Sequence, residues 1–151
     1  MADIYSKAKR ALIMSHVRGG CNKKTELALI GLFRHHKISG WRRRWPLYGR
    51  PDFVFPGSNV AVFVDGCFWH CCPEHSHLPD SNRAFWQRKL AANKARDRRV
   101  TRALRKAGWR VVRIWQHELT HRNESRCVRR IRGALARSRA SRQRPGGKSR
   151  P

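Results

Sequence analysis

The chain has 151 residues, of which 35 are Lys or Arg and only 9 are Asp or Glu, so its formal net charge is +26 at pH 7. Such a charge attracts polyanions and repels cationic partners, which makes nucleic acid the first partner to consider. Hydrophobic residues make up 40% of the chain and include 6 Trp and 6 Phe, more than a basic tail protein of the histone or ribosomal type carries. We therefore expect one folded domain that binds nucleic acid. The alternative is a basic domain that only coats phosphates.

The longest apolar run is VAVFV at residues 60–64, whereas a membrane-spanning helix needs about 20 apolar residues. No secretion signal is evident at the N-terminus, so we expect a cytoplasmic protein, associated with the nucleoid if its partner is DNA. Three of the five cysteines lie within residues 65–72. That bunching suits intracellular metal binding better than a secreted disulfide framework. Cys21 and Cys127 are expected to be free thiols.

The first half of the chain predicts a helix followed by a hairpin. Residues 1–23 form a basic arm or short surface helix, and residues 24–36 form a core-packing helix behind a Thr25 N-cap. Two β-rich runs surround the turn PGSN and predict a β-hairpin. Asp52 stands at the head of its first strand and Asp65 at the end of its second.

The second half adds a Cys/His loop as far as Pro79, a long helix and a third strand. The helical pattern begins at a Ser/Asn cap at Ser81 and stops at Gly108, which has the position of a C′ glycine. The alternating segment 109–115, rich in Val and Ile, follows as the third strand.

The C-terminal region divides into two parts by composition. Residues 125–137 are helical in composition, whereas residues 138–151 form a basic, low-complexity tail that is expected to be disordered. The order α, β, β, α, β, α predicts a mixed α/β domain at residues 24–137, with a small central sheet flanked by helices.

Candidate ligands for a metal ion gather in and after the loop: Cys67, Cys72, His75, His77 and His117. Four nitrogen and sulfur ligands in a tetrahedral set are what zinc prefers, so we predict a structural Zn²⁺ site. Cys71 is less favoured than its neighbour because adjacent residues rarely both ligate one ion. Scattered loop residues without a metal are the alternative.

Three of the few acidic residues, Asp52, Asp65 and Glu26, can converge around the hairpin. Carboxylates hold Mg²⁺, which polarises a scissile phosphodiester and generates hydroxide from water. His70 follows two aromatic residues, and a histidine that titrates near neutrality can take a proton from an attacking water. The alternatives are a turn cap for Asp52 and an ordinary surface residue for His70.

Large aromatic side chains lie in or beside this polar, basic loop: Phe68, Trp69 and Trp86. Such side chains can wedge between base pairs and unstack them. Core packing is the alternative role for each of them.

Six segments of the chain match one family: KAKRALIMSHVRG, TELAL, GRPDFVF, VFVDGCFWH with CPEH, FWQRKLAANKARDRR and GWRVVRIWQHE. From Asp3 to Glu118 the chain resembles the very-short-patch-repair (Vsr) DNA mismatch endonucleases, and GCFWH followed by CPEH is specific to them. The resemblance implies a PD-(D/E)xK-like, restriction-endonuclease-like domain with an added structural zinc. It implies an enzyme that nicks one strand beside the T of a T·G mispair, which arises when 5-methylcytosine deaminates.

The resemblance also implies roles for individual residues. It implies that Asp52 is the central magnesium ligand, with the Val64 carbonyl as a second ligand. It implies that Glu26 and His70 are catalytic. Some members carry Thr-His where Val64-Asp65 stands here, so Asp65 is expected to add a carboxylate. The implied zinc ligands are Cys67, Cys72, His75 and His117, with His77 as the alternative to His75. The residues that intercalate into DNA become Phe68, Trp69 and Trp86.

The implied partners are a double-stranded DNA with a T·G mismatch and, functionally, a DNA cytosine-5 methyltransferase, and the protein is expected to be a monomer. The other class of function is a non-catalytic, zinc-stabilised DNA-binding module that recognises distorted duplex through the same wedge. Asp52, Glu26 and His70 favour the enzyme, because carboxylates that face phosphates only weaken a pure binder.

Overall fold

The computed structural model describes residues 23–143. Its longer elements are α2 (Lys23–His35), β1 (Phe53–Phe55), β2 (Val60–Asp65), α3 (Arg83–Lys106), β3 (Arg110–Trp115) and α4 (Glu124–Gln143). Short 3-10 turns lie at η1 (Pro56–Ser58), η2 (Gln116–Leu119) and η3 (His121–Asn123). This order confirms the predicted sequence of helices and strands. The expected basic arm at residues 1–23 lies, except for Lys23, outside the described residues.

The three strands form one mixed sheet in the order β1-β2-β3. β1 and β2 pair antiparallel as the predicted hairpin, with Phe53 opposite Val62. β2 and β3 pair parallel, with Val64 opposite Ile114. A parallel pair needs a long crossover connection, and α3 provides it.

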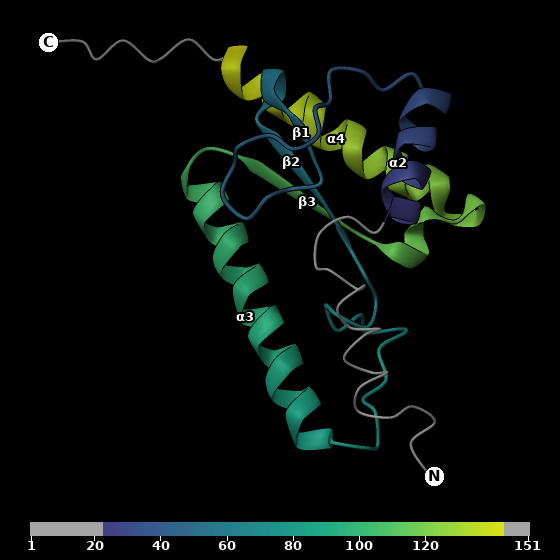
Figure 1. Cartoon of the computed structure of the whole chain (residues 1–151). Helices are drawn as coiled ribbons and strands as arrows, with labels where there is room; N and C mark the ends of the chain where they lie inside the picture. The colour runs from purple at the N-terminus through teal and green to yellow at the C-terminus, as the bar shows by residue number, and fades with distance from the viewer. Residues whose placement is uncertain (1–22, 144–151) are drawn as a thin grey trace, which may run out of the picture.

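Helices cover both faces of the sheet (Figure 1). α2 and α4 pack on one face, where Phe33 and Ile131 are fully buried. α3 packs on the other face through Val100 and Leu104. Strands buried on both faces read as continuous apolar runs rather than alternating ones. That requirement explains why β2 has the sequence VAVFVD.

Gly49 fixes how closely the segment before β1 approaches α3. Its φ is +79°, a left-handed conformation, and a Cβ at this position would lie 2.2 Å from a methyl carbon of Val100. A glycine is therefore needed both for the backbone conformation and for the close contact. The contact holds the chain against α3 just before Asp52.

We expect Gly49→Ala to lower the free energy of unfolding by about 1–3 kcal/mol, because it combines backbone strain with an overlap in the core. Urea denaturation measures this change. Gly57→Ala is the matched control, since nothing lies within 4 Å of its Cβ position, and it should change the free energy by less than about 0.5 kcal/mol. Equal stability of the two variants would contradict the role given to Gly49.

The helix ends differ in part from their predicted positions. α2 begins at Lys23, so Thr25 lies inside the helix and the predicted Thr25 N-cap is wrong. Asn82 is the N-cap residue of α3, which confirms the predicted position of the Ser/Asn cap, but its φ is 54° and its side chain makes no capping hydrogen bond. Gly108 directly follows Ala107, the C-cap residue of α3, and has φ +83°. This confirms Gly108 as the C′ glycine.

α4 continues to Gln143, past the predicted helix end at residue 137. Ser138 is buried, and its hydroxyl donates a hydrogen bond to the carbonyl oxygen of Ser58. The first part of the predicted disordered tail is therefore helical, because Ala and Arg are good helix formers. Residues 144–151 lie outside the description. Between residues 23 and 143, no helix has the length and apolar character needed to cross a membrane.

Candidate active site and metal centre

The adjoining ends of β1 and β2 bring acidic side chains together. Asp52 directly precedes β1 and Asp65 ends β2, and antiparallel pairing places the start of one strand beside the end of the other. Asp52 Oδ2 accepts a hydrogen bond of 2.7 Å from the backbone N–H of Val64. Glu26, in the first turn of α2, lies near enough for its charge to act on Asp52. The three predicted carboxylates thus occupy one region.

Two of these carboxylates, those of Asp52 and Glu26, are largely buried. Burial raises the pKa of Asp52 to about 6, with the Val64 hydrogen bond opposing the rise and the charges of Glu26 and Asp65 adding to it. Glu26 is only 3% exposed. One of its oxygens pairs with Arg43, whereas Oε1 is buried with no hydrogen-bond partner among the described residues. A buried, unpaired carboxylate oxygen is costly, so this region would gain from a bound cation.

Asp65 is already paired. Arg113 of β3 donates Nε and Nη2 to the two oxygens of Asp65, at 2.6 and 2.8 Å, in the bidentate geometry of a strong ion pair. The same guanidinium reaches Asp97 Oδ1 of α3 at 2.9 Å and stacks on the ring of Phe63. Asp65 therefore lies beside Asp52 with both oxygens occupied by Arg113.

His70 faces two of these carboxylates. Its Nδ1 lies 2.5 Å from Asp97 Oδ2 and 3.7 Å from Asp65 Oδ1. Burial lowers the pKa of His70, but the hydrogen bond with Asp97 and the charge of Asp65 outweigh burial and raise it above its usual value. Because Asp97 holds Nδ1, the imidazole can exchange a proton with water only at Nε2. A base oriented in this way by a carboxylate is a recurring catalytic arrangement.

Two residues of this region, Asp97 and Arg113, were not among the predicted site residues. Asp97 is the only acidic residue in α3, and Arg113 is a charged residue in the middle of the apolar strand RVVRIW. Each is out of place in its own element, which is the signal that could have identified them. Their pairing depends on how α3 crosses β3, and local patterns do not report that crossing.

The ligand atoms of four residues converge after β2: Cys67, Cys72, His75 and His117 all lie within 4.8 Å of one another. The Sγ atoms of Cys67 and Cys72 lie 3.3 and 3.6 Å from His117 Nδ1, and Cys72 Sγ lies 3.8 Å from His75 Nδ1. Zinc bonds of about 2.3 Å to sulfur and about 2.0 Å to nitrogen place the two atoms about 3.5 Å apart at the tetrahedral angle. The arrangement therefore fits an ion of the size of zinc.

The structure separates these four residues from the other candidates. Cys71 Sγ points to the carbonyl oxygen of Leu90, at 4.0 Å, and His77 is not part of the group. Glu74 lies 3.6 Å from Nε2 of His117, where a carboxylate orients a metal-binding imidazole. Cys127 is a free, buried core thiol. Cys21 lies outside the described residues.

The predicted wedge residues form one aromatic cluster at the start of α3. Ring centroids of Phe68 lie 5.1 Å from Trp69 and 5.4 Å from Trp86. Trp86 is only 8% exposed, whereas Phe68 and Trp69 are half-buried. Phe85, which the sequence analysis did not select, is 49% exposed and packs 5.3 Å from Trp86. The accessible part of the cluster thus comes from three residues, with Trp86 beneath them.

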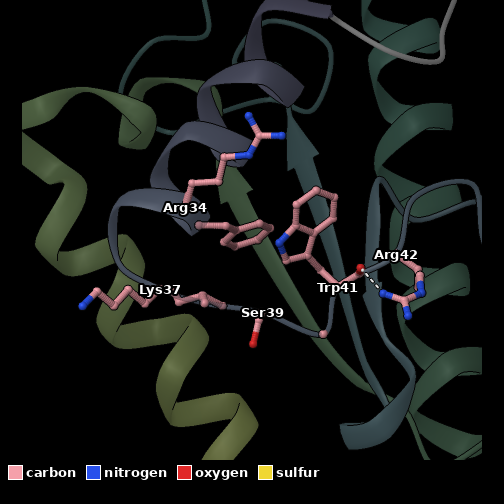
Figure 2. A pocket seen from close by; sticks show the side chains of 8 residues that line it. Arg34, Lys37, Ser39, Trp41 and Arg42 are labelled. Atoms are coloured by element: carbon pink, nitrogen blue, oxygen red, sulfur yellow. Dashed lines mark hydrogen bonds between the residues drawn. The ribbon is translucent and has the colours of Figure 1, made fainter.

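An open cavity of about 660 Å³ lies at the C-terminal end of α2. Figure 2 shows Arg34, Lys37 and Trp41 around it, and Arg42 beside it with a 3.1 Å hydrogen bond to the Trp41 carbonyl oxygen. Asp52 and the other carboxylates of the candidate site are not among its lining residues. The cavity is therefore separate from the candidate active site, and its rim is basic.

The comparisons with known proteins identify relatives of the whole chain. The family model of the DNA mismatch endonuclease Vsr matches residues 2–76. The type II nicking enzyme V.NaeI of Lentzea aerocolonigenes is 54% identical over 69 residues, which cover 46% of this chain and 42% of that protein.

Two further relatives match over most of their length. The type II nicking enzyme V.XorIIP of Xanthomonas oryzae is 41% identical over 126 residues, which cover 80% of this chain and 88% of that protein. The DNA mismatch endonuclease Vsr of Escherichia coli is 33% identical over 131 residues, which cover 82% of this chain and 80% of that protein. Similarity of this extent places the chain, with its small mixed sheet and flanking helices, in the Vsr family of DNA mismatch endonucleases.

Proposed function

We propose that this protein is a Mg²⁺-dependent endonuclease that nicks one DNA strand beside the T of a T·G mispair. The observation that carries the proposal is the group of carboxylates at the ends of β1 and β2, beside the His70–Asp97 pair. T·G mispairs arise when 5-methylcytosine deaminates, so the protein would act in cells that contain a DNA cytosine-5 methyltransferase.

Asp52 and the backbone carbonyl of Val64 would hold the magnesium ion. The N–H and C=O of one residue in an extended strand point to the same side. The Val64 carbonyl therefore faces the side on which its N–H reaches Asp52. Glu26 adds negative charge through its unpaired oxygen. When bound, the ion would polarise the scissile phosphate and lower the pKa of a water.

His70 would remove the proton from the attacking water. Nε2 accepts this proton, while Asp97 at Nδ1 orients the ring and stabilises the imidazolium that forms. Arg113 pairs with both Asp65 and Asp97, so it sets the spacing of the two carboxylates around His70. We infer that Asp65 acts here through Arg113 and the charge it presents to His70.

Affinity for DNA would come from the basic surface. The exposed basic residues of α3 are Arg83, Arg88, Lys89, Lys94, Arg96, Arg98, Arg99, Arg102, Arg105 and Lys106. Cations along a helix bind phosphates without reading sequence, and they make binding strongly dependent on salt. Arg34, Lys37 and Arg42 at the open cavity would add further positive charge near the C-terminal end of α2.

We also propose that the four Cys and His ligands hold a structural Zn²⁺. The ion would join the loop that carries Phe68 and Trp69 to His117, which follows β3. The loop would then present its aromatic rings from a fixed position. His70 lies in the same loop, so recognition and proton transfer would share one support.

For zinc, we expect one equivalent per chain in the freshly purified protein, and its removal should lower the free energy of unfolding by several kcal/mol, because structural zinc contributes directly to folding. Elemental analysis and thermal unfolding measure the two effects. Cys67→Ser should lose the zinc, whereas Cys71→Ser, whose thiol points away to Leu90, should retain it. Purified protein that contains no zinc would contradict the proposal.

The proposed activity is tested with a T·G duplex and its T·A counterpart, each incubated with Mg²⁺ or with a chelator. We expect nicking of the T strand only in the T·G duplex and only with Mg²⁺. Binding without nicking, in Mg²⁺ and in Mn²⁺, would identify the protein instead as a non-catalytic module that recognises distorted DNA. Equal nicking of both duplexes would exclude mismatch specificity.

A further inference from the structure

A second group of metal-ligating side chains lies where α2 meets α4. One ligand atom from each of His35, His36 and Glu124 lies within 4.8 Å of the other two. The residues stand at the end of α2 and the start of α4. His35 is nine residues from Glu26, or roughly 13 Å along the helix. This group is therefore separate from the carboxylates of the proposed active site.

Imidazole rings surround both oxygens of Glu124. His36 Nε2 lies 2.6 Å from Oε1, and His121 Nδ1 lies 3.0 Å from Oε2. The rings of His35 and His36 meet edge to face with centroids 4.9 Å apart. Three histidines thus gather around one carboxylate, with ligands from α2, α4 and the turn before α4.

The fold holds the inner part of this group in place. The side chains of His36 and Glu124 are 25% and 20% exposed. Arg132 of α4 donates a hydrogen bond of 2.9 Å to the carbonyl oxygen of His36. Lys37 has φ 53°, so the chain reverses directly after His36. The two consecutive histidines thus lie directly before a turn of the chain, with their rings in contact.

Ion pairing alone does not account for this composition. An exposed or half-exposed ion pair contributes about 0–1 kcal/mol to stability. One histidine beside Glu124 would be enough to form it. Three imidazoles brought together in a chain of net charge +26 would repel one another if they were protonated. Neutral imidazoles with one carboxylate are instead a donor set that suits Zn²⁺, Ni²⁺ and Cu²⁺, whereas Mg²⁺ and Ca²⁺ prefer oxygen ligands.

We propose that His35, His36 and Glu124 form a second site for a divalent transition metal, which joins α2 to α4. The side chain of His121 is 99% exposed and contacts Glu124 Oε2 at 3.0 Å, so a rotation of this ring would let it supply a fourth ligand when the ion is bound. The site contains no thiolate and lies partly at the surface. It therefore binds zinc more weakly than the Cys/His group and exchanges it with the solution.

The test is equilibrium dialysis of the full chain against Zn²⁺, followed by thermal unfolding at the same zinc concentrations. Wild type should bind two equivalents, and the second should raise Tm, because a ligand that binds only the folded state stabilises it. His36→Ala and Glu124→Gln should bind one equivalent and lose the second rise in Tm. His77→Ala is the control for adventitious binding to an exposed histidine and should bind two.

Cobalt separates the two sites by their spectra. Co²⁺ in the Cys/His group produces thiolate-to-metal charge-transfer absorption, whereas Co²⁺ bound by nitrogen and oxygen ligands does not. Cys67→Ser should lose the charge-transfer band and keep the binding that depends on Glu124. The proposal is overturned if wild type binds one equivalent only, or if Glu124→Gln keeps the second. Both readouts are independent of nicking, so they test this site whether or not the proposed function is correct.

Discussion

Asp52→Asn is expected to reduce the rate of nicking of a T·G duplex by about 10³-fold or more. A bound metal that acts as a Lewis acid stabilises the transition state by several kcal/mol, and each 1.4 kcal/mol changes the rate about tenfold. The amide oxygen of Asn can still accept the hydrogen bond from Val64 N–H that Asp52 accepts. The variant therefore removes the charge and keeps the local structure. Binding of the mismatch should be unchanged or slightly tighter, since a negative charge facing phosphates is lost.

Single-turnover nicking at saturating Mg²⁺, together with binding measured without Mg²⁺, separates chemistry from affinity. Asp80→Asn is the matched control, because Asp80 is fully exposed and forms a 4.0 Å ion pair with Arg83. The control should nick at the wild-type rate. Nicking by Asp52→Asn at near the wild-type rate would show that Asp52 only caps the turn after Pro51.

The closeness of Asp52 to the end of the second strand was predictable, because the turn of a hairpin limits how its two strands can pair. Once PGSN is identified as the turn, Asp52 must lie beside the end of the second strand, and the structure places it against Val64. The convergence of the four candidate metal ligands was predictable for a different reason, since few residue types bind zinc. Spacing alone left His75 and His77 open, and the loop geometry places His75, not His77, in the group.

The partners of His70 were not predictable in the same way. Asp97 is 27 residues away in the chain, and its position depends on how α3 crosses β3. The local sequence does not distinguish Arg113 from the many other basic residues. In the structure, however, its guanidinium pairs with both Asp65 of β2 and Asp97 of α3. Patterns along the chain identify which residues can do chemistry. The pairing between them is decided by packing of elements that are distant in sequence.

The same reasoning applies to the aromatic residues. Phe85 follows a polar turn at the start of α3. The local sequence pattern does not indicate that this exposed aromatic residue has a function. Its 5.3 Å contact with Trp86 makes it part of the cluster with Phe68 and Trp69. Burial also distinguishes Trp86 from the others, because a side chain that is 8% exposed can enter a base stack only if the cluster opens. Trp86→Ala would leave a cavity, so it is a poor probe of recognition.

Phe68→Ala and Trp69→Ala should each lower the ratio of affinities for T·G and T·A duplexes by about tenfold or more. A mispair is easier to unstack than a matched pair, so a wedge beside it meets a smaller penalty than the few kcal/mol per step of paired duplex. General affinity is expected to come instead from the 35 basic residues and should change by less than about threefold, since phosphate contacts carry no sequence information. Phe85→Ala should have an intermediate effect.

Binding of the two duplexes at several fixed salt concentrations measures both quantities, because salt weakens the phosphate contacts and acts little on the wedge. Tyr48→Ala is the matched control: Tyr48 is 56% exposed and lies outside the aromatic cluster, so it should leave the ratio unchanged. If the Phe68 and Trp69 variants keep the wild-type ratio and lose only stability, the two rings are core residues. Recognition of the mispair would then have to come from contacts to the base edges, and the loop that carries the candidate zinc ligands would serve only to hold His70 against Asp97.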